Sequence, residues 1–103
     1  MKTKLDEARE VINEVDEEMI ALFIKRMAAV SMVAEYKAEN NLPVLDSGRE
    51  DVVRDKNLEL LASKQLESYY KTFFDGVLKA SKDYQADLMK LYEGSKKWKH
   101  MHY

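Results

Sequence analysis

The amino-acid sequence predicts an all-α protein with one very long helix, one short helix and one helix of medium length. Apolar residues recur at alternating intervals of three and four residues over much of the chain, as on one face of a helix. The 103 residues include only 3 glycines and 1 proline, and β-branched runs are few, so little favours a β-sheet. A chain of this length forms one domain.

The first helix is expected over residues 4 to 40. Its apolar residues follow the strict 3-4 spacing of a coiled-coil seam: Leu5, Ala8, Ile12, Val15, Met19 and Leu22. The same phase continues through Ala29, Val33 and Tyr36. No residue that ends a helix occurs before Asn40, Asn41 and Pro43, so the helix is expected to run that far.

Two more helices are expected after Pro43. The second begins after Asp46 and Ser47, which are residues typical of a helix N-cap, and uses the apolar residues Val52, Val53, Leu58, Leu60 and Leu61. The third covers about residues 66 to 91, with Tyr70, Phe73, Val77, Tyr84, Leu88 and Leu91. Residues 1–92 form the helical domain, and we expect the basic, aromatic segment 93–103 to be a flexible tail.

The composition excludes several classes of protein. The formal net charge is -2, so the chain lacks the basic character that general nucleic-acid binding requires. Without cysteine it can form neither disulfides nor a thiolate metal site. No apolar run approaches the roughly 18 residues of a membrane span, and the start MKTKLDEARE is too charged for a signal peptide. We expect a cytoplasmic protein that binds neither nucleic acid nor membrane.

The length of the first helix predicts a homodimer. A helix from residue 4 to 40 is about 55 Å long at about 1.5 Å per residue, whereas a compact chain of this size has a radius of gyration of about 13 Å. The helix therefore extends beyond the rest of a single chain and carries an apolar stripe with it. Exposed stripes of this size normally mark a partner surface, and two paired long helices would cover it.

Arg26 interrupts the apolar seam at a position where an apolar residue is expected. Burial of an unpaired guanidinium is costly, so Arg26 needs an anionic partner or contact with water. Lys37 follows 11 residues later, close to three full turns and about 16.5 Å along the axis. Val30 and Val33 lie between them on the same face. Two cations at the ends of a short apolar strip are suited to a small dianion.

The stretch VLDSGRED, residues 44–51, places Asp46, Arg49 and Glu50 within five positions. Its simplest interpretation is a helix start, because Asp is a common N-cap and acidic residues suit the first turn. The alternative is that it holds a ligand.

The third helix carries one stripe that changes from apolar to polar: Phe74, Leu78, Ser81 and Gln85. Taken alone, it is most simply a solvated edge of the helix.

Arginine is used sparingly. Of 17 basic residues only 4 are arginine, at positions 9, 26, 49 and 54, so arginine is available for bidentate binding of carboxylates while lysine provides solubility. Arg9 precedes Lys37 by 28 residues, or about 42 Å along a helix. If Arg9 serves the same pocket, it must do so from the other subunit of an antiparallel helix pair.

These residues, in this order, resemble the all-helical (AroQ) class of chorismate mutases. The stretch LDEAREVINEVDEEMIALFIKRM resembles the family's first helix, and YKAENNLPVLDSGRE resembles its lysine, proline and Asp-x-x-Arg-Glu segment. Ser81 and Gln85 resemble its Ser-x-x-x-Gln. The resemblance covers about residues 5 to 90. It implies an intertwined homodimer of three-helix chains, and a monofunctional enzyme that converts chorismate to prephenate without a metal or cofactor.

The resemblance also implies a role for each polar residue. Arg26, and Arg9 from the other chain, hold the two carboxylates of chorismate with help from Ser81. Lys37 and Gln85 donate hydrogen bonds to the ether oxygen, and Glu50 accepts one from the ring hydroxyl. Asp46 lies beside Glu50, and Arg49 contacts substrate or braces this acidic pair.

Two other functions remain as alternatives. An isochorismate-pyruvate lyase shares the fold and most of the pocket that the resemblance implies. A non-catalytic helical dimerisation module would explain the long apolar seam, but neither Arg26 within it nor the sparing use of arginine.

Overall fold

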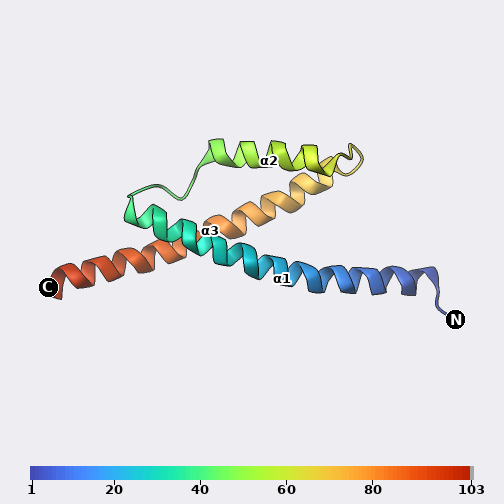
Figure 1. Cartoon of the computed structure of the whole chain (residues 1–103), viewed down its shortest axis with the longest axis horizontal. Helices are drawn as coiled ribbons and strands as arrows, with labels where there is room; N and C mark the ends of the chain where they lie inside the picture. Colours follow the sequence, from blue (N-terminus) through green and yellow to red (C-terminus); the bar gives the residue numbers. More distant parts are fainter. Residues whose placement is uncertain (103) are drawn as a thin grey trace.

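The computed structural model describes the backbone of residues 1–102 and the side chains of residues 1–94. The chain forms three helices: α1 (Lys4–Glu39), α2 (Ser47–Leu61) and α3 (Glu67–His102). α1 and α3 cross near the middle of the molecule, and α2 lies along the first part of α3 (Figure 1). No β-strand occurs in residues 1–102. The predicted all-α fold with three helices is confirmed.

α1 begins and ends close to the predicted residues. Thr3 and Asp6 form a capping box, in which each side chain accepts a hydrogen bond from the other residue's backbone N–H at 3.1 Å. These bonds satisfy N–H groups that have no partner inside the helix. At the other end, the Asn40 N–H donates to the Tyr36 carbonyl oxygen at 3.0 Å, and Asn41 adopts a left-handed φ of 54°.

α2 begins as its sequence predicts. The Asp46 carboxylate caps the helix by accepting a hydrogen bond from the Arg49 N–H at 3.0 Å. Ala62 ends the helix with a left-handed φ of 52°. None of the α2 residues is buried, so polar contacts and half-buried side chains hold this helix in place.

α3 is longer than predicted. It extends past the expected end at Leu91 to His102, and its 36 residues equal those of α1. The apolar pattern stops near Leu91, but residues 92–102 contain no proline and only Gly94 as a weak helix former, so the sequence has no strong stop there. The side chains of residues 95–103 lie outside the described part of the chain, and the expected flexible tail stays a prediction.

The core of the single chain is small. Its buried apolar residues are Val30, Ala34 and Ala38 of α1 and Phe74 of α3. Every residue from 1 to 25 is exposed. The radius of gyration is 18.8 Å and the extents are 69 × 31 × 15 Å, against about 13 Å for a compact chain of this length. In the described part of the chain, no helix is long and apolar enough to cross a membrane.

Candidate functional site

One cavity of about 250 Å³ is lined by all three helices and by the segment between α1 and α2. Its polar lining consists of Arg26, Lys37, Asp46, Arg49, Glu50, Ser81, Lys82 and Gln85. Its apolar lining consists of Val30, Val33, Val44, Val53 and Leu78. Seven of the eight residues predicted for the site therefore lie around one cavity, although they come from segments far apart in the sequence.

Arg26 and Ser81 contact each other at one part of this cavity. The Arg26 guanidinium donates a hydrogen bond to Ser81 Oγ, and Ser81 Oγ donates to the carbonyl oxygen of Val77 at 2.8 Å. Ser81 is buried and Arg26 is half-buried. The serine thus orients a guanidinium that has further N–H groups for a ligand.

Lys37 connects three segments at another part of the cavity. Its ammonium donates to the carbonyl oxygen of Val44 at 2.8 Å and to Gln85 Oε1 at 2.9 Å. An ammonium has three N–H donors, so one remains after these two bonds. Because the amide oxygen of Gln85 accepts from Lys37, its NH₂ group is the part that can donate to a ligand.

The first turn of α2 forms the rim of the cavity. Asp46 caps the helix, Arg49 is exposed, and Glu50 is half-buried. The Glu50 carboxylate forms an ion pair with the Lys82 ammonium of α3 at 3.1 Å. The stretch VLDSGRED is therefore both a helix start and part of the cavity wall, so the two interpretations of this stretch are compatible.

The polar stripe on α3 is not a solvated edge. Phe74, Ser81 and Gln85 are all buried, with exposed fractions of 5%, 5% and 8%. α1 covers this face, as the contacts of Arg26 with Ser81 and of Lys37 with Gln85 show. The interpretation as a solvated edge is therefore wrong, because α1 packs against this face of α3 and excludes water from it.

Arg9 does not join the cavity of its own chain. It lies in the exposed first part of α1, about 42 Å along the helix from Lys37 at about 1.5 Å per residue. The separation expected from the sequence is confirmed. The predicted contribution of Arg9 from a second chain stays a prediction.

Lys82 was not predicted for the site. Its position contained a signal, because Lys82 follows Leu78 by four residues and precedes Gln85 by three, which places it beside the polar stripe. The carbonyl group of Val44 was also missed, and a backbone acceptor has no signal in the sequence.

The cavity has the features of a site for a small anion. Four cationic side chains and two carboxylates line it, and five apolar side chains separate them. Charge-assisted hydrogen bonds from Arg and Lys are the strong contacts for carboxylates. Among the described residues, no group of three or more His, Cys, Asp or Glu side chains could hold a metal ion.

Comparisons with known proteins point to one family. Residues 8–86 match the family described as "Chorismate mutase type II". The chain is also 34% identical over 71 residues to the bifunctional chorismate mutase/prephenate dehydratase of Buchnera aphidicola subsp. Schizaphis graminum (strain Sg). That alignment covers 69% of this chain and 18% of the Buchnera protein, so the chain spans a small part of that relative. No solved structure matches the chain.

Proposed function

Because the chain belongs to the type II chorismate mutase family, we propose that it catalyses the 3,3-sigmatropic (Claisen) rearrangement of chorismate to prephenate. The observation that carries this proposal is the cavity in which Arg26 and Lys37 face the same apolar strip. Their partners, Ser81 and Gln85, come from a different helix. Such an arrangement suits a small dianion with an apolar ring.

The reaction is unimolecular, so the protein contributes conformation and electrostatics. Chorismate carries two carboxylates, and its enolpyruvyl arm must lie over the ring before the new bond forms. Clamping both carboxylates selects that conformation. Negative charge then develops on the ether oxygen as the C–O bond breaks. Donors already aimed at that oxygen stabilise the transition state more than the substrate.

The described contacts support a role for each side chain. Arg26, oriented by Ser81, binds one carboxylate. Lys37 and the NH₂ group of Gln85 donate to the ether oxygen, since each keeps a donor after their mutual hydrogen bond. Glu50 accepts from the ring hydroxyl.

The remaining two residues complete the rim of the cavity. The backbone of Asp46 and its carboxylate shape the edge beside Glu50, because Asp46 holds the first turn of α2. Arg49 is exposed at the same edge and contacts the substrate or braces the acidic pair.

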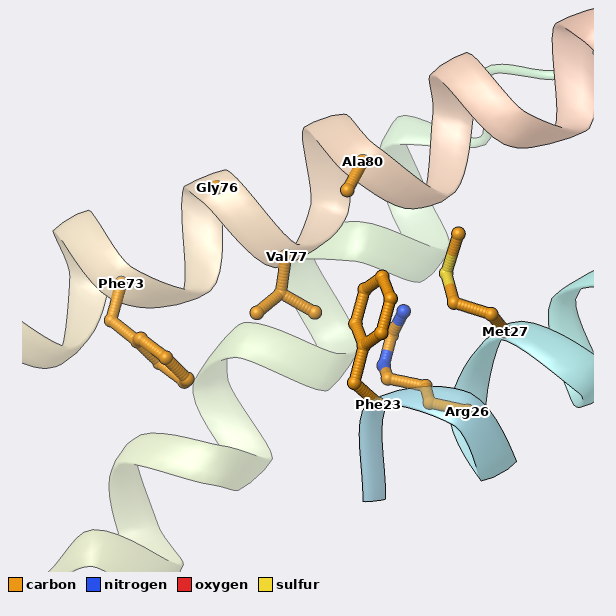
Figure 2. Close-up of a pocket in the computed structure, with 7 residues that line it drawn as sticks. All are labelled: Phe23, Arg26, Met27, Phe73, Gly76, Val77 and Ala80. Carbon is orange, nitrogen blue, oxygen red and sulfur yellow. The ribbon is translucent and has the colours of Figure 1, made fainter. Parts of the chain in front are cut away.

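Two copies of the chain are proposed to pair through α1 and α3. An apolar hollow of about 240 Å³ lies between these helices, and the side chains of Phe23 and Met27 point toward α3 there (Figure 2). An adjoining hollow of about 400 Å³ reaches Met19 and Leu22. With residues 1–25 wholly exposed, a second copy is the simplest cover for this surface.

Pairing also supplies a side chain that can bind the second carboxylate of the substrate. Arg9 is too far from the cavity of its own chain to reach a ligand there. An antiparallel arrangement of two α1 helices brings the start of one helix beside the middle of the other. We therefore assign Arg9 to the cavity of the partner subunit, where it binds the second carboxylate.

The decisive experiment adds purified protein to chorismate and follows the loss of chorismate absorbance, with prephenate identified by chromatography. Isochorismate is tested in parallel, with pyruvate release as the readout. Formation of prephenate supports the proposal. Preferential release of pyruvate from isochorismate identifies a lyase instead, and no turnover of either compound indicates a non-catalytic dimerisation module.

A further inference from the structure

Lys82 is a cavity residue to which the proposed reaction gives no task. It follows Ser81 on α3, and its ammonium lies 3.1 Å from Glu50 Oε1 on α2. The Lys82 side chain is 36% exposed and that of Glu50 is 18% exposed. Both line the same cavity, so this ion pair stands at the edge of the site rather than on the outer surface.

We propose that Lys82 is a positioning residue that holds the Glu50 carboxylate in place for the ring hydroxyl of the substrate. The inference rests on the proposed function, since it needs a substrate with a hydroxyl at this edge. Lys82 acts through Glu50 and does not itself contact the reacting atoms.

The local structure shows why Glu50 needs such support. It lies in the first turn of α2, a helix without a buried residue, and its side chain has several rotatable bonds. In the described part of the chain, the Glu50 carboxylate accepts no hydrogen bond and its one ion pair is with Lys82. A carboxylate offers about four acceptor positions, so Glu50 can contact Lys82 and still accept from a hydroxyl.

Charge gives a second reason. A bare carboxylate at the edge of the cavity repels a dianionic substrate, and the repulsion increases as water is excluded. Lys82 offsets that charge while leaving the acceptor oxygens of Glu50 in place. Of the four cations that line the cavity, Lys82 is the one whose ion pair with Glu50 is seen among the described residues.

The competing explanation is that Lys82 only fastens α2 to α3. The chain contains a matched control for this possibility. Arg54 of α2 forms an ion pair with Asp75 of α3, with Nη2 and Oδ1 3.0 Å apart. This pair joins the same two helices, but neither residue lines the cavity.

The test compares the steady-state kinetics of wild type with Lys82→Met, Lys82→Arg and Arg54→Met, using chorismate and an analogue that lacks the ring hydroxyl. Glu50 binds the hydroxyl in substrate and transition state alike, so its misplacement raises KM and leaves kcat largely unchanged. We expect Lys82→Met to raise KM for chorismate by about 10-fold with kcat within about 2-fold of wild type. Lys82→Arg keeps the wild-type KM because it keeps the positive charge, and Arg54→Met also has wild-type kinetics.

Two comparisons separate positioning from other effects. With the analogue, Lys82→Met raises KM much less than with chorismate, because no hydroxyl is present for Glu50 and only the charge effect remains. In a Glu50→Gln background, Lys82→Met has no further effect on KM. Circular dichroism of each variant verifies that the helices form, and Lys82→Gln takes the place of Lys82→Met in these comparisons if Lys82→Met does not fold.

Several results overturn the inference. A rise in KM for Arg54→Met equal to that for Lys82→Met shows that the ion pair only fastens the helices. An unchanged KM for Lys82→Met in an active enzyme removes the role of Lys82 and leaves the proposed function intact. A wild-type protein that does not turn over chorismate overturns both.

Discussion

The Lys37 ammonium and the Gln85 amide oxygen lie 2.9 Å apart and join α1 to α3 across the candidate site. The bond fixes the position of a cation and orients a side-chain amide, and Lys37 is half-buried while Gln85 is buried. Two donors that are placed before the substrate arrives need little rearrangement when charge develops. The proposed catalysis depends on this pair for both donors to the ether oxygen.

Lys37→Ala is expected to lower kcat by about 10²–10³-fold and to change KM much less, because the ether oxygen gains its charge mainly in the transition state. Initial rates over a range of chorismate concentrations measure both constants. Lys79→Ala is the matched control. Lys79 is exposed on α3, where the neighbouring Asp83 carboxylate raises its pKa, and it lies outside the cavity. Equal kcat for Lys37→Ala and wild type would end the assignment of Lys37.

Mixing two inactive variants tests the contribution of Arg9 from the partner subunit. Arg9→Ala and Arg26→Ala are each expected to lose on the order of 2–4 kcal/mol of transition-state stabilisation. Denatured together and refolded, they should recover about a quarter of wild-type activity, because about half of the dimers are mixed and each mixed dimer has one intact site.

The control for this experiment is the same treatment of each variant alone, which should give no recovery. If Arg9 acted within its own chain, each site of a mixed dimer would lack one of the two arginines. No chain in the mixture carries both arginines, so no activity would return.

A charge on the apolar face of α1 should prevent pairing. Leu22 is exposed in the single chain and borders the apolar hollow between α1 and α3. Leu22→Glu is expected to yield a monomer in analytical ultracentrifugation, with weaker helical circular dichroism, because burial of an unpaired charge is costly. Asn13→Glu is the control and should stay dimeric. Asn13 precedes Leu22 by nine residues, which at about 100° per residue places the same charge on the opposite side of the helix. A dimeric Leu22→Glu protein would contradict the proposed pairing surface.

Glycine at position 62 should stabilise the fold. Ala62 has a φ of 52°, a conformation that costs a residue with a Cβ roughly 1–2 kcal/mol. Glycine avoids this cost, but its greater freedom in the unfolded chain offsets part of the gain. We therefore expect Ala62→Gly to increase the free energy of unfolding by about 0.5–1 kcal/mol. Urea unfolding measures this change. Asn41→Gly is the comparison, since Asn41 has a similar φ of 54° but asparagine tolerates it, and its gain should be smaller.

Helix starts were predictable because their requirements are local. Asp46 was expected to cap the second helix, and its carboxylate does accept the hydrogen bond from the Arg49 N–H. The end of α3 was not predictable from its apolar pattern. That pattern reports which residues a neighbouring element covers, whereas a helix continues as long as its backbone bonds form and no residue interrupts them.

The site was predictable where a polar residue occupied an apolar position. Arg26 stood out because it interrupts the seam, and the structure places it in the cavity. Lys82 did not stand out, because a lysine on a helix is usually a solvated residue. Its contact with Glu50 depends on how α2 lies against α3, which is a tertiary arrangement that no local pattern specifies.

The exposed first half of α1 has a consequence for how the protein reaches its active form. The interior of the single chain holds few apolar side chains, so in the proposed dimer most of the stability comes from pairing, and refolding should follow second-order kinetics. The half-time should shorten in proportion as the protein concentration rises. Catalysis per chain should decline on extreme dilution, since a single chain lacks the arginine that we assign to the partner subunit.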